Sequence, residues 1–290
     1  MGRYDNLRKI EQLDPIKDHA EIVKIMVGYE FPWDFQRSYI ELGLAKAFAS
    51  PRIAGLVAKR GYTQAHTQKR YDDSSIMMFE MIKHGYDSEQ GRACIERMNY
   101  IHGHFKINNQ DFIYSTAALI VEPIHWNDRF GWRRMSENEK LAWLTFCLEI
   151  GKRMKIKDLP DSLAEIENFK QEYEDKFVYN SPAAKELYLI FVGLISSWFP
   201  LVPRGLVELV FRCILDDRSL KAFELEAPPV AVKKFVEFCL HTRAWVLSYL
   251  PPRNRSGLFV DRPSRSYPAN NYDVTKLGPS DENLKKKISG

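Results

Sequence analysis

The amino-acid sequence predicts an all-α protein, folded as a single-domain bundle of many helices. Apolar residues recur at intervals of three and four between joints marked by glycine and proline, and no alternating run of strand length interrupts this pattern. The chain has 290 residues, of which 45% are hydrophobic, so it can bury one sizeable core. Buried helices packed around a common centre are therefore expected.

Each predicted helix lies between two joints, such as Phe31-Pro32, Ser50-Pro51, Gly85 and Ser181-Pro182. Ser136 followed by Glu139 is typical of a capping box at a helix start. The predicted helices span residues 16–29, 34–49, 52–60, 66–84, 88–105, 109–121, 136–155, 161–178, 183–198, 204–216 and 230–249.

Composition divides the chain into a helical domain over residues 1–250 and an irregular basic C-terminal tail over residues 251–290. The tail is rich in proline, glycine and polar residues, and it carries the excess of basic residues behind the net charge of +4. Its closing Lys285-Lys286-Lys287 is expected to be a solvated end. Because the domain itself is neutral, it lacks the basic groove that nucleic acid requires, and no nucleic-acid partner is expected.

Cysteine usage and the absence of a signal peptide predict an intracellular protein. The cysteines lie far apart among apolar neighbours, which favours reduced thiols. The N-terminus, MGRYDNLRKIEQLDP, is too polar for a signal peptide or anchor, although its abrupt start leaves room for an upstream anchor. The apolar run 187–202 is shorter than the roughly 20 residues of a membrane span. A buried core helix is the favoured interpretation of this run, and peripheral membrane contact is the alternative.

Common catalytic motifs are missing from the sequence. It contains no G-x-S-x-G elbow, no phosphate-binding P-loop, no G-x-G-x-x-G after a strand and no H-E-x-x-H. Glu80 with His84 and Glu237 with His241 are spaced i,i+4, whereas di-iron bundles use E-x-x-H, so a di-iron site is disfavoured.

The segment RMNYIHGHF carries two histidines, of which at most one can serve a buried site. On a regular helix His102 lies about 40° from Met98, on the buried stripe, while His104 lies about 120° away on the side of Arg97. The two side chains therefore cannot bind the same metal ion, and the angle favours His102 as the ligand. The alternative is a core histidine that is hydrogen-bonded to a backbone carbonyl.

A second helix, KRYDDSSIMMFEMIKHG, carries the groups that a haem pocket requires. Arg70 could pair with propionates, Asp73 and Ser74 are short polar groups for the space beside bound dioxygen, and Met77 and Met78 are soft side chains suited to a porphyrin face. The alternative is a core helix with a solvated arginine.

These segments resemble the MpaB-type oxygenases, which belong to the superfamily that includes the latex-clearing rubber oxygenases. The resemblance covers most of residues 20–253 and rests on the order and spacing of several blocks. These blocks are KRYDDSS, MNYIHGHF, NNQDFIYSTAALIVEPIHWNDRFGWRRMSENEK, LDDRSLKAFELEAPP and HTRAWVLSYLPPR.

The resemblance implies a single-domain, multi-helix, globin-like bundle around one haem b (iron protoporphyrin IX). It implies that His102 is the iron ligand, that Arg70 supports the haem and that Ser74 stands where threonine is usual. Arg70, Asp73 and Ser74 are then the expected catalytic residues, with dioxygen and a hydrophobic molecule as partners. Arg129, Trp132 and Arg133 are further candidates for propionate pairing, with a turn fixed by burial of the tryptophan as the alternative. His125 is expected to be structural.

Two departures separate the chain from the rubber-cleaving relatives. They carry a lysine where this chain has Asp73, and an upstream glutamate where residues 42–79 contain none. The pattern is closer to the fungal branch bound to the endoplasmic reticulum (ER), which cleaves a double bond in a prenyl side chain. The expected location is cytoplasmic, or ER-membrane-associated if an N-terminal anchor was removed.

The resulting hypothesis is a haem b-dependent oxygenase that uses dioxygen to cleave or oxidise a C=C bond of a lipophilic, prenyl- or terpenoid-like substrate. Two alternatives remain: a haem-binding carrier or sensor without turnover, and a haem-free protein that binds a hydrophobic ligand.

Overall fold

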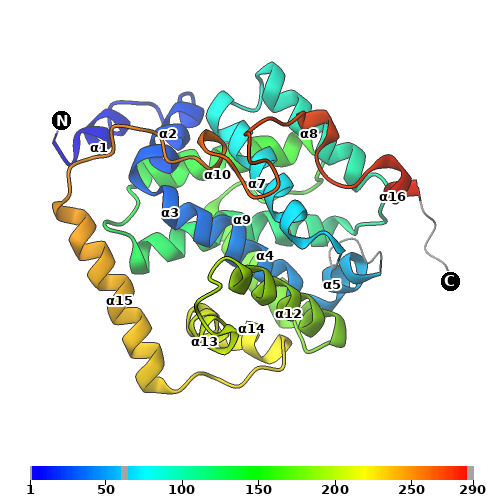
Figure 1. The fold of residues 1–290 in the computed structure, drawn as a ribbon. Helices are drawn as coiled ribbons and strands as arrows, with labels where there is room; N and C mark the ends of the chain where they lie inside the picture. Colours follow the sequence, from blue (N-terminus) through cyan, green and yellow to red (C-terminus); the bar gives the residue numbers. More distant parts are fainter. Residues whose placement is uncertain (1, 60–64, 286–290) are drawn as a thin grey trace.

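Helices joined by loops make up all of the chain that a computed structural model describes, residues 2–59 and 65–285 (Figure 1). The all-α prediction is confirmed over these residues. Arg60, at the expected end of helix 52–60, and Lys286 and Lys287 of the closing lysine run lie outside the described residues.

The N-terminal part of the chain consists of short α-helices and π-helical turns, and Phe31 and Pro32 are buried where η1 ends and α3 begins. The sequence predicts continuous helices over 16–29 and 34–49, but both contain π-helical turns, and Pro32 starts a new helix because it has no N–H to continue the previous one. These elements are α1 (Asp5–Ile10), α2 (His19–Ile25), η1 (Met26–Glu30), α3 (Pro32–Phe35), η2 (Gln36–Leu42), α4 (Gly43–Phe48) and α5 (Pro51–Ala58).

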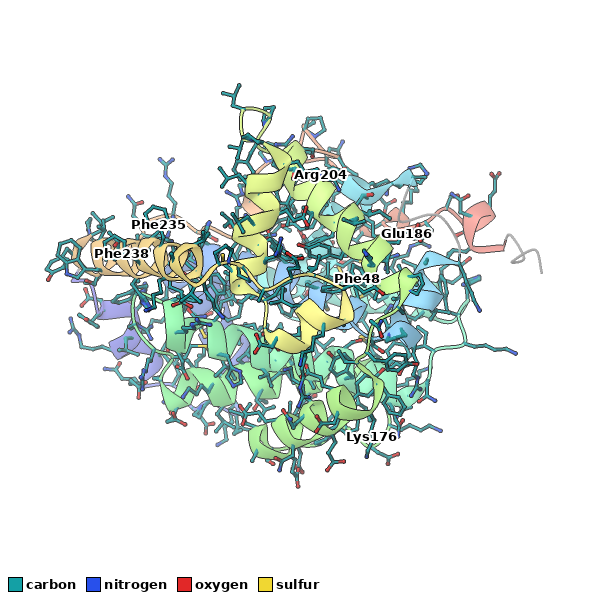
Figure 2. The ribbon with its side chains drawn as sticks, turned by 90° about the horizontal axis from the view of Figure 1, so that it is seen from below. Phe48, Lys176, Glu186, Arg204, Phe235 and Phe238 are labelled. Carbon is teal, nitrogen blue, oxygen red and sulfur yellow. The ribbon has the colours of Figure 1, made fainter. Side chains whose placement is uncertain are left out.

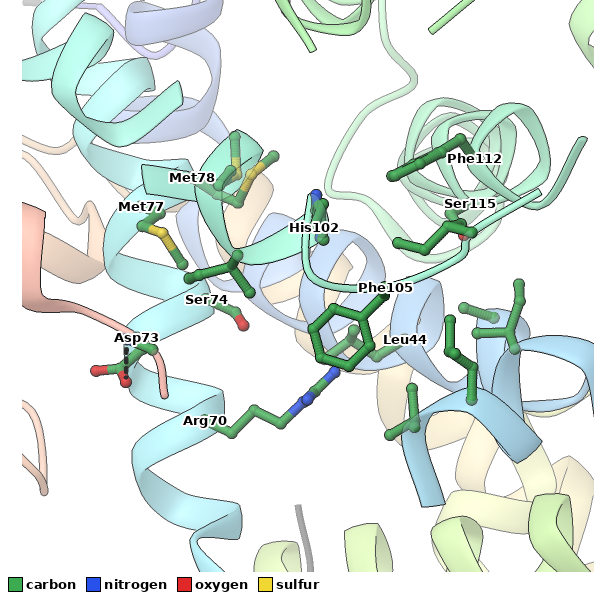
Figure 3. A pocket seen from close by; sticks show the side chains of 18 of the residues that line it. Leu44, Arg70, Asp73, Ser74, Met77, Met78, His102, Phe105, Phe112 and Ser115 are labelled. Carbon is green, nitrogen blue, oxygen red and sulfur yellow. Dashed lines mark hydrogen bonds between the residues drawn. The ribbon is translucent and has the colours of Figure 1, made fainter. Parts of the chain in front are cut away.

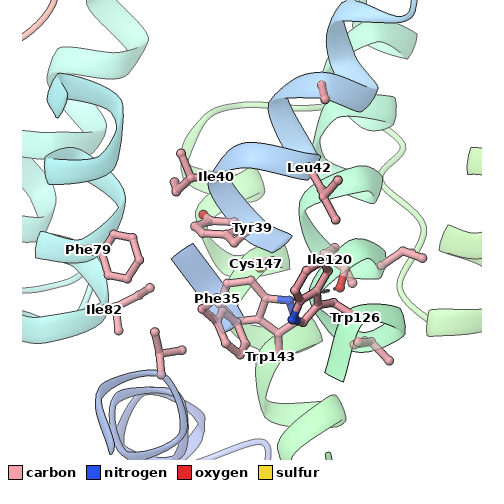
Figure 4. Packing of buried hydrophobic residues seen from close by; sticks show 14 of the residues in the cluster. Phe35, Tyr39, Ile40, Leu42, Phe79, Ile82, Ile120, Trp126, Trp143 and Cys147 are labelled. Atoms are coloured by element: carbon pink, nitrogen blue, oxygen red, sulfur yellow. Dashed lines mark hydrogen bonds between the residues drawn. The ribbon is translucent and has the colours of Figure 1, made fainter. Parts of the chain in front are cut away.

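The core centres on Trp143, whose side chain is fully buried. Its ring lies edge-to-face against Phe35 and Tyr39, with centroids 5.0 and 5.1 Å away, and its Nε1 donates a hydrogen bond to the Ile120 carbonyl at 3.2 Å (Figure 4). Elements from three parts of the sequence, α3–η2, α9 (Asn109–Phe130) and α10 (Glu137–Arg153), are thereby fixed to one another.

Helix α9 is longer than the predicted helix 109–121 because it continues through Pro123. The proline removes one backbone hydrogen bond, yet Ile120, Ile124 and Trp126 on either side are all buried. Packing against α4, α10, α11 (Leu163–Phe177) and η2 therefore outweighs the local cost of the proline.

Helices α7 (Thr67–His84) and α8 (Glu89–His102) form an adjacent pair. The pair is close at its turn, where a Cβ added to Gly91 would lie 2.1 Å from the Gly85 carbonyl oxygen. Ser88 caps α8 by accepting a hydrogen bond from the Gly91 N–H at 2.9 Å. The sequence predicts a helix to residue 105, but α8 ends at His102, and the chain turns tightly after it.

The later helices follow the predicted order. Ser136 and Glu139 form the predicted capping box at the start of α10. Helix α12 (Pro182–Ser197) buries Leu187, Phe191 and Ile195, which confirms the core-helix interpretation of most of the run 187–202, although Leu201 beyond it is exposed. The others are α13 (Arg204–Ile214), α14 (Asp217–Ala222) and α15 (Val230–Tyr249). In the part of the chain described, none of the helices combines the length and hydropathy of a transmembrane segment.

The C-terminal segment, residues 251–285, runs back over α7 and α8 (Figure 1). It contains only short helical pieces, and it buries Leu258, Val260, Val274 and Leu277. The pieces are η3 (Phe259–Asp261), η4 (Val274–Lys276) and α16 (Asp281–Lys285).

Glu41 is a buried carboxyl group on the π-helix η2. Its side chain lies 2.6 Å from Arg37 Nη1 and accepts a hydrogen bond from the Tyr71 hydroxyl at 3.2 Å. Burial raises the pKa of Glu41 from its usual 4.5 to about 7.

This pKa predicts a pH dependence of stability. The carboxyl group of Glu41 loses its proton at a lower pH in the unfolded state than in the folded state. Its contribution to the free energy of unfolding is therefore fully present below pH 4.5. It falls by about 2–4 kcal/mol as the pH rises to about 7. Urea unfolding across this range should show that Glu41→Gln loses this part of the slope. Glu137→Gln, at a glutamate whose side chain is 89% exposed, should keep the wild-type slope; equal slopes in all three proteins would contradict the assignment.

Candidate functional site

A cavity of about 780 Å³ lies between η2–α4, α5, α7, the end of α8, α9, α10 and the C-terminal segment (Figure 3). This volume is in the range of small-molecule and cofactor sites, about 300–1,000 Å³. Its walls are mainly apolar, and they include Leu44, Phe48, Met98, Phe105 and Phe112. The cavity can therefore hold a large apolar ligand.

His102 lines the cavity as the last residue of α8. Its Nδ1 is buried and has no hydrogen-bond partner among the described residues, and its ring stands edge-on to Phe112 with centroids 5.3 Å apart. Burial, with a smaller contribution from the charge of Arg70, lowers the pKa of His102 to about 4. The imidazole is therefore neutral at neutral pH, with a lone pair available on one nitrogen.

His104 does not line the cavity. Its Nδ1 lies 2.8 Å from the Tyr100 carbonyl oxygen, and its ring packs on that of Tyr100. The two histidine side chains point in different directions, as the angle on a regular helix predicts, but the cause is different. The helix has already ended, and the Phe105 N–H donates to the His102 carbonyl at 3.0 Å in the following turn.

Helix α7 presents Arg70, Ser74, Met77 and Met78 to the cavity. Arg70 and Ser74 are one turn apart, and Figure 3 shows the arginine side chain and the serine hydroxyl on the side of α7 that faces Phe105 and His102. A cation, a hydroxyl group and two polarisable thioethers thus border the same space as the neutral imidazole.

Asp73 belongs to the wall of the cavity, but its carboxylate is directed to the C-terminal segment. It accepts hydrogen bonds from the Tyr267 hydroxyl at 2.6 Å and from the Gly278 N–H at 2.8 Å, and it also bonds Lys69. Arg70, Ser74 and His102 therefore line the same cavity, whereas the Asp73 carboxylate oxygens bind the C-terminal segment.

The C-terminal segment completes the cavity through Gly278, Pro279, Asn283 and Leu284. Arg97 of α8 holds it by donating to the Leu277 and Pro279 carbonyls at 2.7 and 2.8 Å. Gly278 has a φ of +80°, and an added Cβ would lie 2.6 Å from Ile101 Cδ1.

Sequence reasoning misses this contribution because the tail's composition predicts an irregular segment and gives no partner for it. The available signal is the apolar spacing of Val274 and Leu277 followed by Gly278-Pro279.

The other candidates lie away from the cavity. Arg133 bonds Glu139 and Glu30, and the Trp132 indole donates to the Glu30 carbonyl at 3.1 Å, as the turn interpretation requires. His125 pairs with a surface glutamate, and Arg129 bonds Glu237.

Comparisons with known proteins agree with the geometry. Residues 41–248 match the family model described as the catalytic domain of ER-bound oxygenase mpaB/B' and rubber oxygenase. The chain is 28% identical over 257 residues to ER-bound oxygenase mpaB' of Penicillium brevicompactum, covering 82% of this chain and 60% of the relative. It is 28% identical over 225 residues to mpaB of the same organism, covering 71% and 57%. It is 27% identical over 224 residues to mpaB of Penicillium roqueforti (strain FM164), covering 70% and 74%.

The chain thus spans about three fifths of the length of the two P. brevicompactum relatives. Among solved structures, latex clearing protein LCP in the closed state matches with a TM-score of 0.58 and 11% identity, over 86% of this chain and 73% of that one. This match shows a shared fold.

The role of Asp73 as an anchor of the C-terminal segment can be tested by substitution. Asp73→Asn weakens a buried charged acceptor, so we expect the free energy of unfolding to fall by about 1–3 kcal/mol. We also expect faster hydrogen exchange at the Gly278 N–H. Asp161→Asn, at an exposed aspartate, should change neither quantity. Unchanged exchange at Gly278 in Asp73→Asn would show that other contacts hold the segment.

Proposed function

The chain belongs to the family of mpaB/B'-type and rubber oxygenase catalytic domains, and on this premise we propose that it is a haem b-dependent oxygenase. The proposed reaction uses dioxygen to cleave or oxidise a C=C bond of a lipophilic, prenyl- or terpenoid-like substrate. The observation that supports the proposal is the neutral imidazole of His102, whose Nδ1 is buried, at the wall of a large, mainly apolar cavity.

The residues at the cavity fit a haem. A buried ring nitrogen without a partner is costly, about 1–3 kcal/mol, unless a ligand uses it. Among residues 2–59 and 65–285, no group of three or more His, Cys, Asp or Glu side chains could hold a metal ion. A lone histidine suits a metal whose other ligands come from a macrocycle, and His102 is the residue that would bind it.

The remaining side chains have distinct tasks in this proposal. The Arg70 guanidinium offers a cation for a propionate or for polarising the reacting side, and the Ser74 hydroxyl offers a hydrogen bond to a polar ligand. Met77 and Met78 supply polarisable contacts to a flat apolar ligand. When bound, the haem supplies the activation of dioxygen. Asp73 acts as a positioning residue, because its contacts fix the segment that closes the cavity.

The apolar walls support a lipophilic substrate, and one C=C bond and one dioxygen yield two carbonyl groups without an external electron donor. The relatives named ER-bound support an intracellular protein associated with the ER membrane.

The histidine assignment predicts a difference between two alanine variants. Purified wild-type protein should show a haem absorption spectrum that changes on reduction. His102→Ala should lose most of its haem because the axial ligand is gone, while His104→Ala should keep a nearly unchanged spectrum. The reverse result would overturn the assignment, and colourless wild-type protein after haem supplementation would favour the haem-free alternative.

The reaction can be tested with prenyl alcohols of several lengths under oxygen, with mass spectrometry to detect carbonyl products. We expect products from the wild-type protein, none without oxygen, and at least a tenfold lower rate from Ser74→Ala if its hydroxyl orients a reacting group. Ser115→Ala is the matched control, because the Ser115 hydroxyl also borders the cavity but donates to the Asp111 carbonyl in its own helix. Absence of product from every alkene, with haem retained, would favour a carrier or sensor.

A further inference from the structure

Helix α15 (Val230–Tyr249) is apolar on two sides, although only one side packs against the body of the molecule. On the inner side, Ala244 is buried, and Leu240 and Leu247 pack against the core. On the outer side, Phe238 and Tyr249 are 65% and 74% exposed. A surface helix usually carries polar residues on the side that faces away from the core, whereas the outer side of α15 is apolar and has no covering surface among the described residues.

The inner side of α15 is firmly attached. Arg243 pairs with the buried carboxylate of Asp34 at 2.9 and 3.1 Å, and its guanidinium stacks over the Trp33 ring at 3.8 Å. Glu237 of α15 accepts a hydrogen bond from Arg129 of α9. These contacts fix the rotation of the helix, so the exposure of its aromatic side chains is a property of the folded protein.

The exposed aromatic residues form one stripe along α15, which Thr242 interrupts. Phe235, Phe238, Trp245 and Tyr249 are spaced three, seven and four residues apart, which places them within an arc of about 80°. Their exposed fractions are all above 60%. Figure 2 shows Phe235 and Phe238 on α15 at the margin of the molecule. Exposed apolar surface of this kind marks an interaction site.

The charges around the stripe indicate a negatively charged partner. Lys234 is exposed near the start of α15, and Arg253 and Arg255 are exposed just after its end. Glu237 is the only acidic residue between Pro228 and Gly257, and Arg129 already pairs with it. Pairing of α15 with a second copy of itself would bring these cations together, in either orientation.

We propose that α15 docks onto the surface of a phospholipid bilayer that contains acidic headgroups, with its axis parallel to the membrane. The phenylalanines enter the boundary of the acyl chains, and Trp245 and Tyr249 occupy the interface that their amphipathic rings favour. Lys234, Arg253 and Arg255 meet the headgroups. Lys233, Glu237 and Arg243 within the helix prevent it from crossing the membrane. This surface is independent of the cavity and of the proposed oxygenase activity.

The test is co-sedimentation of the full chain with phosphatidylcholine vesicles, with and without phosphatidylserine. Wild-type protein should bind the acidic vesicles more strongly, and added salt should weaken this binding. The double variant Phe235→Ser/Phe238→Ser should reduce the partition coefficient by at least tenfold. Tyr179→Ser, at an aromatic residue that is 55% exposed between α11 and α12, is the matched control and should bind as the wild type does.

Three results would overturn the proposal. One is absence of wild-type binding to both kinds of vesicle, and another is unchanged binding by the double variant with intact circular dichroism. The third is light scattering that shows a wild-type dimer that the double variant converts to a monomer, which would assign the stripe to a second copy. His102→Ala should bind vesicles as the wild type does, so failure of the haem proposal leaves this test unaffected.

Discussion

Helix α7 lines the cavity with one face and binds the C-terminal segment with another. The rest of the site depends on the hydrogen bonds between this segment and α7. Asp72, Asp73 and Glu80 are buried carboxyl groups that face the segment. They accept hydrogen bonds from the Ser266 N–H at 2.8 Å, from Tyr267 and Gly278, and from the Tyr272 hydroxyl at 2.6 Å. Burying a carboxylate without such donors is expensive. The segment is therefore part of the folded domain, and it fixes the register at which Arg70 and Ser74 face the cavity.

The position of His102 follows from where α8 begins and ends. Ser88 caps its start, and Gly91 allows that start to lie directly against the turn after α7. The helix then reaches His102 and stops, which leaves the imidazole at the cavity wall instead of inside a close-packed helix interface. The same apolar walls that accept a lipophilic ligand keep the ring neutral, because they withhold the water that would stabilise its charged form.

The sequence predicts what depends on local periodicity and misses what depends on distant contacts. The all-helical class, the cap at Ser136 and the different directions of His102 and His104 follow from spacing along single helices. The passage of α9 through Pro123 does not, because it results from packing on several sides. The direction of the Asp73 carboxylate does not either, because its donors lie about 200 residues away in the sequence. Composition alone assigns those donors to an irregular tail.

The cavity and the aromatic stripe of α15 lie in different places, and this separates attachment from ligand binding. Figure 1 shows α15 and α16 at opposite edges of the fold, and α16 contributes Leu284 to the cavity wall. Contact of α15 with a membrane would therefore leave the wall formed by Pro279 and Leu284 distant from the attached face. Any rearrangement of that wall must then break contacts of Arg97 and Asp73 within the domain, and it does not require the molecule to leave the bilayer.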